Sequence, residues 1–554
     1  MVTAVSRRKS ELDEILVQSI VLGSLEVARQ ALQMGARRLE DALLTAVCHA
    51  NNAAVDLLLD FPIHVNALSP TTGLSALHHC VIQGDTATLK LLLSKGKANP
   101  NVHSKGLSSY TPLQCCLLAP RPNYTVLRLL LESGANAKVG LNGISLLFIL
   151  PDEFAAAAVP LLLQYGADIT TPQGFTALHT ASATGQIQKM QALLQAENSI
   201  DLLHHLDNQG DTALHWAAAE GQLHAIRWLL DQDSRLIDRV NKEGQTCLDV
   251  ACAKKQADAA LYLLPRISPV PQDSSTVEYS VYTPLHWLCE ADKERSPYTY
   301  EDKGLCNLAQ ALVEKQKHDC PHKTTTSIIH ASTPLGEQAL HLAARWSAPL
   351  CQWLLEQGAN PLAGDVRMKR GTLLMAASEG TVETVSCLLD KVARAKHHEL
   401  LNQQDENGWT ALHYAACRQH PKMLKILLQH GASVEIRNQH GRQPLHLVGA
   451  NTNFPLACSG MHDDVISHIL DHSCDLPNLH VPDSISRECI RVLVHSGASA
   501  TAVDQRGDLP FFLVACTEKI ECCFEMVRVA AGQGMFDGNS TQRSMERKLT
   551  KHLA

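Results

Sequence analysis

A short block of about seven residues recurs along the chain, and its spacing constrains the fold more than any other feature. The clearest copies are TALHTAS from Thr176, TALHWAA from Thr212 and TALHYAA from Thr410. Looser copies lie between them, so that the block returns at intervals of about 33 residues. This period predicts an array of small helical units, each of which buries its apolar face against its neighbours.

The first residue of each block fixes the register of the array. The blocks begin at Ser75, Thr111, Ser145, Thr176, Thr212, Thr246, Thr283, Gln338, Gly371, Thr410, Gln443 and Leu509. Two weaker units begin at Glu14 and Asp41, and the doubled interval before Leu509 predicts a degenerate unit near Leu476. The sequence therefore predicts about 14–15 units.

Each unit has the residues of a helix-turn-helix. A Thr or Ser at the start of the block is a good N-cap for a first helix, because its side chain can accept a hydrogen bond from the backbone. Small residues such as Ala217 and Ala218 allow the second helix to pack closely, after a turn at a glycine such as Gly221. The second helix is expected to end at a glycine in the left-handed conformation. These glycines are Gly35, Gly96, Gly134, Gly166, Gly358, Gly431 and Gly497.

These features resemble the ankyrin repeat family, whose units carry a T-P-L-H-like block in about 33 residues. The resemblance covers about residues 11–536 and implies a mainly α fold, a solenoid of stacked helix-turn-helix units with β-hairpin-like fingers. We expect the stack to be less regular at the units that lack the histidine of the block. Those units have Gln114, Phe148, Asp249, Leu374 or Phe512 in its place.

The sequence predicts two stacks joined by a linker that contains three prolines. Two stretches break the period and are expected to be insertions. The short ends leave no room for a further domain of the kind that many ankyrin proteins carry. The predicted segments are a short N-terminal segment (1–10), an N-terminal stack (11–264), the linker (265–281), a C-terminal stack (282–536) with insertions near 291–336 and 449–483, and a polar tail (537–554).

Charge and composition argue against several classes of protein. The formal net charge of −8 argues against nucleic-acid binding, which needs a basic face. No signal peptide is visible, and the longest apolar run, Phe154 to Leu163, is too short to span a membrane. The 18 cysteines are scattered without a CxxC motif, which is typical of reduced thiols in a cytoplasmic or nuclear protein. The segment RRKS resembles a kinase site, so Ser10 is a candidate for phosphorylation.

Histidine is the residue type that most invites a catalytic interpretation, but its placement favours a structural one. A residue that recurs once in each unit serves that unit, whereas catalysis needs one convergent cluster. The family resemblance implies that these imidazoles bridge backbone groups of adjacent fingers. The seven histidines in this place are His78, His179, His215, His286, His341, His413 and His446.

The segment HDCPH in the predicted 291–336 insertion is the strongest candidate for a metal site. It contains His318, Cys320 and His322, and zinc binds both residue types. A single H-x-C-x-H lacks the paired spacing of zinc modules, so no metal or other cofactor is predicted. The common nucleotide-binding, metalloprotease and serine-hydrolase motifs are absent, which predicts a non-enzymatic protein. A metal-dependent enzyme or sensor remains the alternative from another class.

The remaining prediction is a surface that binds proteins. By the family resemblance, the variable positions of the concave surface lie just before the block and just after the small residues of the first helix. The predicted contacts are Asn208, Gln209, Asp211, Glu220, Arg345, Trp346, Lys369, Arg370, Glu406, Asn407, Trp409 and Arg418. We expect a monomeric scaffold or adaptor that binds partner proteins. The alternative within this class is a substrate-recruiting subunit for a separate enzyme, such as a ubiquitin ligase.

Overall fold

The computed structural model describes most of the chain. The described residues are 2–105, 109–119, 121–138, 140, 144–196, 202–267, 282–291, 302–321, 324–379, 381–448, 483–500, 502–505, 510 and 529. They form short α-helices joined by turns, with isolated antiparallel β-bridges at the turns. The mainly α fold predicted from the sequence is confirmed.

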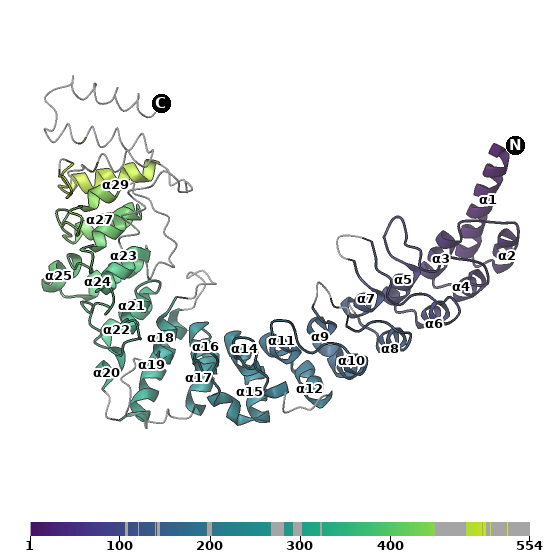
Figure 1. Cartoon of the computed structure of the whole chain (residues 1–554), viewed down its shortest axis with the longest axis horizontal. Coiled ribbons are helices and arrows are strands. Elements are labelled where there is room, and N and C mark those ends of the chain that lie inside the picture. Colours follow the sequence, from purple (N-terminus) through teal and green to yellow (C-terminus); the bar gives the residue numbers. More distant parts are fainter. Residues whose placement is uncertain are drawn as a thin grey trace, which may run out of the picture. The chain divides into compact units, whose positions relative to one another are not determined.

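The chain divides into two compact parts, Met1–Cys247 and Leu248–Ala554, each of which contains several repeats. Below, the first unit and the second unit mean these two parts, and a unit named by its first residue is a single repeat. Helices of the first unit lie in consecutive pairs along the chain (Figure 1). They are α1 (Val2–Val21), α2 (Leu25–Gln33), α3 (Leu39–Cys48), α4 (Asn52–Leu58), α5 (Ala76–Gln83), α6 (Thr86–Ser94), α7 (Pro112–Leu118), α8 (Tyr124–Glu132), α9 (Leu146–Ile149), α10 (Asp152–Gln164), α11 (Ala177–Thr184), α12 (Ile187–Ala196), α14 (Ala213–Ala219), α15 (Leu223–Gln232) and the 3-10 turn η1 (Ser234–Asp238).

The second unit repeats the paired arrangement with more irregular connections. Its first helix, α16, starts at the last residue of the first unit. The elements are α16 (Cys247–Ala253), α17 (Ala257–Leu263), η2 (Leu264–Arg266), α18 (Pro284–Cys289), α19 (Asp302–Asp319), α20 (Thr325–Ile329), α21 (Ala339–Ala343), α22 (Ala348–Glu356), α23 (Thr372–Glu379), α24 (Val382–Lys391), η4 (Arg394–Lys396), α25 (His397–Leu401), α26 (Ala411–Cys417), α27 (Pro421–Gln429), η5 (Pro444–Leu447) and α29 (Asp483–His495).

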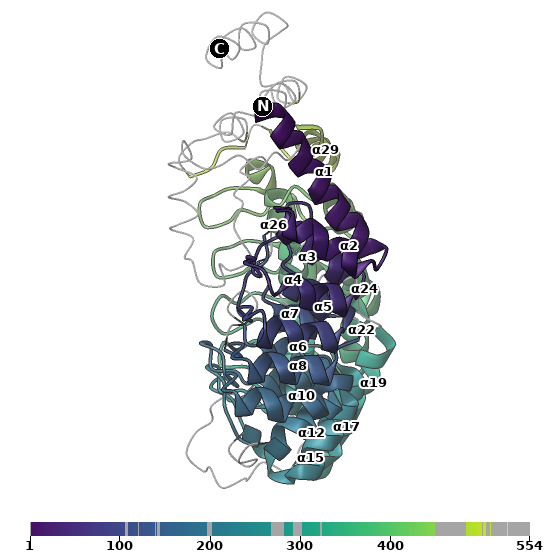
Figure 2. The ribbon, with the colours of Figure 1, turned by 90° about the vertical axis from the view of Figure 1, so that its right-hand side faces the viewer.

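Each unit has two helix layers. In the first unit, α3, α5, α7, α9, α11 and α14 pack in succession as one layer, and α2, α4, α6, α8, α10, α12 and α15 pack as the other. In the second unit, α18, α21, α23 and α26 form the first layer, and α17, α19, α22, α24, α27 and α29 the second. The fingers of the first unit project to one side of both layers (Figure 2). Ala217 and Ala218 are fully buried between the layers, as their small size predicts.

The block residues start the first helices as the sequence predicts. Ser75, Thr111 and Thr212 each accept a hydrogen bond from the backbone N–H three residues later and form a capping box. The first helices α5 and α11 end at Gly84 and Gly185, both with φ of 72°. This left-handed conformation costs glycine no steric clash, which explains its place at these turns.

The glycines predicted to end the second helices adopt the left-handed conformation with one exception. Their φ angles lie between 81° and 96° at Gly35, Gly134, Gly166, Gly358, Gly431 and Gly497. The prediction is wrong at Gly96, because the next residue, Lys97, takes the positive φ of 48° instead. Three turns between paired helices use a positive φ without glycine, at Ala50, Lys255 and Gln419.

Part of the predicted irregular segments is helical. Residues 302–319 of the predicted 291–336 insertion form α19, the second helix of the unit that begins at Thr283, with 18 residues. Helix α1 begins at Val2, so residues 2–10 are part of a helix and not a separate segment. The predicted linker stays a prediction, because residues 268–281 lie outside the described part. Most of the 449–483 insertion, the polar tail and most of the unit from Leu509 also lie outside it.

Candidate functional site

An Asp or Asn side chain fixes the tip of each regular finger. In the first unit, Oδ1 of Asp207 accepts hydrogen bonds from the N–H groups of Gln209 and Asp211 at 2.8 and 2.9 Å. In the second unit, Oδ1 of Asp405 accepts them from Asn407 and Trp409 at 2.9 and 2.7 Å. Because these bonds satisfy the turn internally, the backbone of the fingertip is ordered before any partner arrives.

In the repeats that have it, the block histidine connects one finger to the next, and we call this contact the brace. The backbone N–H of Thr212 donates to Nδ1 of His215 at 3.2 Å, and Nε2 of His215 lies 3.2 Å from the carbonyl oxygen of Gln245 in the next finger. Since Nδ1 accepts a hydrogen bond, the proton of the neutral ring is on Nε2, which donates to the carbonyl. The bond to the next finger is 2.7 to 3.2 Å long at His78, His179, His215, His286, His341 and His413.

In two further repeats, one residue of the brace is replaced by glutamine: Gln443 stands in place of the threonine and Gln114 in place of the histidine. At His446, the N–H of Gln443 donates to Nδ1 at 3.1 Å, as in the other units. In the unit from Thr111, Oε1 of Gln114 accepts from the threonine N–H at 2.7 Å, and its Nε2 donates to the carbonyl of Gly140 at 2.8 Å. A glutamine amide thus makes both bonds of the imidazole.

Burial keeps these imidazoles neutral. Desolvation lowers the pKa of His179, His413 and His446 to about 4, against the opposing effect of the backbone carbonyls that they contact. At His179 and His413, both nitrogens of the neutral ring are bonded to backbone groups, which leaves no free nitrogen for proton transfer or metal binding. The arrangement therefore suits a structural brace.

The predicted surface of the first unit is polar and largely accessible. Asn208, Gln209 and Glu220 are exposed, whereas Asp211 is half-buried. Oδ1 of Asp211 accepts a hydrogen bond from Nδ2 of Asn241 at 2.9 Å, so neighbouring fingers are also connected through their side chains.

A row of aromatic rings beside this surface was not predicted. The ring centroids of Phe148 and Phe175 lie 5.8 Å apart, and those of Phe175 and Trp216 lie 5.1 Å apart. All three rings are half-buried, and Nε1 of Trp216 donates to Oδ2 of Asp207 at 3.0 Å. The three residues hold different positions relative to their blocks, so no single sequence position reveals the row.

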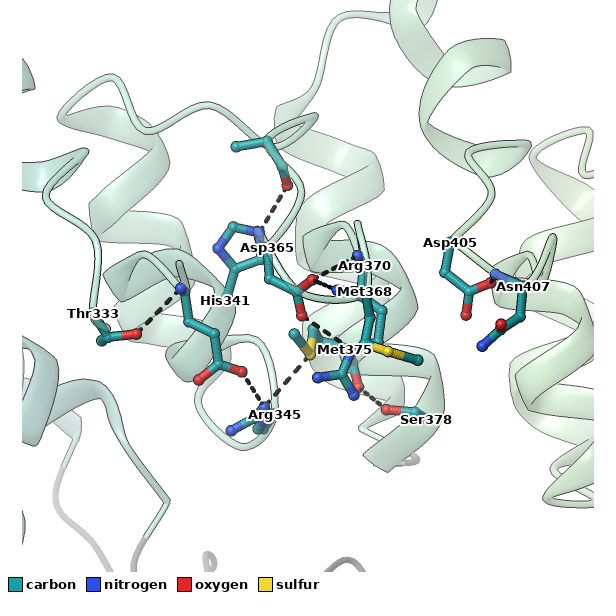
Figure 3. A network of polar contacts seen from close by, with 12 residues as sticks. Thr333, His341, Arg345, Asp365, Met368, Arg370, Met375, Ser378, Asp405 and Asn407 are labelled. Atoms are coloured by element: carbon teal, nitrogen blue, oxygen red, sulfur yellow. Dashed lines mark hydrogen bonds and ion pairs between the residues drawn. The ribbon is translucent and has the colours of Figure 1, made fainter. Parts of the chain in front are cut away.

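The predicted surface of the second unit contains paired charges (Figure 3). Nη2 of Arg345 lies 2.6 Å from a carboxylate oxygen of Glu337, and Nε of Arg370 lies 3.1 Å from Asp365. Both acids are buried, whereas the arginine side chains are 20% and 19% exposed. The two arginines lie near Met375 of α23, whose Sδ is 3.6 Å from Arg345. Buried acids thus orient guanidinium groups that are only partly exposed.

The next fingers add further exposed charges. Lys369, Glu406 and Arg418 are exposed, and Asn407 is half-buried. Burial raises the pKa of Asp405, whose Oδ2 accepts a hydrogen bond from the Tyr414 hydroxyl at 2.7 Å. This contact repeats the one between Trp216 and Asp207 in the first unit.

The two tryptophans in the predicted surface contribute mainly to packing. The expectation that Trp409 is an exposed contact is wrong, because its side chain is only 5% exposed and lies against Tyr414 at 5.0 Å between ring centroids. Trp346 is half-buried, and its Nε1 donates to the carbonyl of Cys289 at 2.7 Å. Nζ of Lys255 lies 5.1 Å from the centre of the Trp346 ring.

The described part of the HDCPH segment, residues 318–321, lies at the end of α19. His318 is in the last turn of this helix and is largely exposed, and Cys320 follows the helix. His322 lies outside the described residues. Among the described residues, no group of three or more His, Cys, Asp or Glu side chains is placed to hold a metal ion. None of the helices in the described part is long and apolar enough to cross a membrane.

Helix pairs stacked in two layers and joined by braced fingers define an α-solenoid repeat protein. The family model for three-copy ankyrin repeats matches residues 43–141, 152–238, 200–273, 340–438 and 373–476, which together make up more than half of the chain. The chain belongs to the ankyrin repeat family.

Known proteins resemble the chain over its repeats. The human transient receptor potential cation channel subfamily A member 1 is 30% identical over 169 residues, which are 29% of this chain and 14% of that protein. The E3 ubiquitin-protein ligase KEG of Arabidopsis thaliana is 27% identical over 215 residues, 38% of this chain and 12% of the ligase. The solved ankyrin repeat domain of Bcl-3 matches with a TM-score of 0.28 and 22% identity, covering 49% of this chain and 93% of that domain. The chain thus spans only a small part of either full-length relative.

Proposed function

We propose that the protein is a non-enzymatic scaffold or adaptor that binds partner proteins through its fingertips and the adjoining ends of its first helices. The observation that carries this proposal is the combination of rigid fingers with exposed polar side chains. Asp207 and Asp405 hold the fingertip backbones, and the block histidines connect successive fingers. Six of the twelve predicted contact residues are exposed, namely Asn208, Gln209, Glu220, Lys369, Glu406 and Arg418.

A surface of this kind binds with little loss of conformational entropy, because the groups that contact the partner are already ordered. Exposed side chains of both signs can select a partner by charge complementarity. Arginine is also frequent in interface hot spots, and Arg345 and Arg370 are partly exposed here. Ankyrin repeats generally mediate protein–protein interaction, which agrees with this use of the surface.

The test is affinity capture with the full-length chain, compared between wild type and the double variant Lys369→Glu with Arg418→Glu. Both substitutions reverse an exposed charge without removing a buried contact. Lys396→Glu is the matched control, since it reverses an exposed charge at η4, after the second helix α24. We expect specific partners to be lost by the double variant and kept by the control. Retention of the same proteins by all three chains would contradict the proposal for this surface.

Recruitment of substrates to a ubiquitin ligase is the second candidate. It is favoured by the match to the repeats of the ligase KEG, which covers only 12% of that protein. Here the captured proteins would include a ligase, and ubiquitination of another captured protein would require the chain. A reconstituted reaction with and without the chain distinguishes this role from simple scaffolding.

A further inference from the structure

The aromatic row of the first unit, Phe148, Phe175 and Trp216, has features that go beyond packing. The rings come from three successive repeats, and each is in contact with the next. They are half-buried, so each leaves part of its surface accessible. Aromatic residues make up only 4% of the chain, so a continuous row of three across neighbouring repeats is a concentrated binding feature.

Carboxylates border this row on the fingers. Oδ2 of Asp207 lies 3.0 Å from Nε1 of Trp216, at the edge of the indole ring. Asp211 is half-buried, and its carboxylate contacts the neutral side chain of Asn241. Among the described residues, no Lys or Arg forms an ion pair with Asp207 or Asp211. The cation nearest to these fingers that the contacts show is Lys242, which donates to the backbone next to Asp207 and forms no ion pair with either carboxylate.

The negative charge of Asp211 also affects the block histidine of this repeat, His215. Burial lowers the pKa of His215, and the negative charge of Asp211 opposes this effect. Exposed Glu220 lies at the end of α14, the helix that carries Trp216. The Trp216 end of the row therefore combines aromatic rings with the carboxylates of Asp207 and Asp211, which is the combination that attracts a guanidinium or ammonium group.

We propose that this face of the first unit binds an extended basic segment of a partner protein, with Arg or Lys side chains over the aromatic row. The proposal rests on the proposed function and names the chemistry of one of its partners. Side chains on one face of an extended strand are about 6.6–7 Å apart, since each residue advances about 3.3 Å. The ring centroids are 5.8 and 5.1 Å apart, which is shorter than this spacing, but the long side chains of Arg and Lys at alternate positions can bend to reach successive rings.

A nearby cation provides a test of the charge argument. Exposed Lys242 lies on the next fingertip, where its Nζ donates to the carbonyl of Asn208 at 2.8 Å. Its positive charge repels a basic segment, so Lys242→Glu should strengthen binding. Lys90→Glu makes the same change in net charge at an exposed position on α6, away from the row. Comparison of the two separates a local effect from an effect of net charge.

The experiment measures fluorescence anisotropy of a labelled arginine–serine repeat peptide with the full-length chain, and of a glutamate–serine peptide as the control. We expect Trp216→Leu to weaken binding about tenfold and Asp211→Asn about threefold, because they remove an aromatic face and a charge. Asp211→Asn is isosteric and retains an oxygen that can accept from Asn241, so its effect does not depend on a change in folding. Lys242→Glu should tighten binding about threefold, and Lys90→Glu should leave it unchanged.

Tyr414→Leu provides a matched control in the second unit. Tyr414 donates to Asp405 as Trp216 donates to Asp207, so the substitution removes an equivalent bond outside the row. Equal binding by wild type and Trp216→Leu would overturn the proposal. So would equal effects of Lys242→Glu and Lys90→Glu, or tighter binding of the glutamate peptide. None of these results would affect the capture experiment with the double variant Lys369→Glu and Arg418→Glu. Failure of the basic-segment proposal can therefore be distinguished from failure of the proposed function.

Discussion

The brace histidine His413 makes a quantitative prediction about acid sensitivity. Burial lowers its pKa from 6.5 to about 4 in the folded chain, whereas an unfolded histidine takes up a proton near 6.5. The unfolded state therefore binds more protons between these two values, and the folded state loses stability as the pH falls from 6.5 to 4. At 1.36 kcal/mol for each pH unit, the full loss is about 3 kcal/mol, and most of it, about 2–3 kcal/mol, has occurred by pH 4.5.

Substitution of His413 by Gln isolates this contribution. Gln114 shows that a glutamine can accept from the threonine N–H and donate to the next finger, at 2.7 and 2.8 Å. The variant should therefore keep both backbone bonds, with a loss near neutral pH of about 1 kcal/mol from the packing of the ring against Trp409. When the pH is lowered from 7 to 4.5, the variant should lose about 2–3 kcal/mol less stability than wild type.

Amide hydrogen exchange in α26, read by mass spectrometry, gives the free energy of local opening at each pH. His398→Gln, which changes an exposed side chain on α25, is the control and should follow wild type. If His413→Gln and wild type lose the same opening free energy between pH 7 and 4.5, the imidazole is not a neutral buried brace and the reasoning is refuted.

Four further predictions concern stability. Burial lowers the pKa of Lys189 to about 8, so stability measured by urea unfolding should rise from pH 8 to 10.5, and Lys189→Met should abolish this rise. Ala50→Gly should stabilise by about 0.5–1 kcal/mol in the same assay, because it relieves a φ of 51°, and a loss of stability would contradict that origin. Trp409→Ala should cost about 3–5 kcal/mol, since a 5% exposed ring leaves a cavity; a loss under 1 kcal/mol would indicate a surface residue. Arg442→Leu should cost about 3–5 kcal/mol by removing the ion pair between its Nε and the buried carboxylate of Asp504, 3.2 Å away, and Asp504→Asn with Arg442→Leu should recover part of it.

Much of the fold could be predicted because its signals are local. The caps at Thr111 and Thr212 depend on residues only three positions apart, and the period of the block places each helix pair against the next. The turns at Lys255 and Gln419 could not be predicted in the same way. Their side chains do not favour a positive φ, and the conformation is imposed by the packing of the paired helices.

The candidate site was harder to predict, because equivalent positions in a repeat do not have equivalent exposure. Asp211 and Trp409 both lie just before a block, yet the first is half-buried and the second is buried. The large apolar ring packs against Tyr414, whereas the carboxylate remains partly solvated. The row that includes Phe175 joins three repeats, and a prediction made one repeat at a time does not find contacts of this kind.

Two buried lysines explain how the stack continues where a first helix ends early. Helices α9 and α18 are each followed by a residue in extended conformation, Leu150 and Glu290, so their last carbonyls lack a glycine turn. Nζ of Lys189, from α12, donates to the carbonyls of Phe148 and Leu150 at 3.0 and 3.4 Å. Nζ of Lys255, which precedes α17, likewise donates to the backbone carbonyl of Glu290 at 2.6 Å. A positive charge at the C-terminal end of a helix is favourable, so in both places an adjacent repeat supplies the cap that the sequence of the short helix lacks.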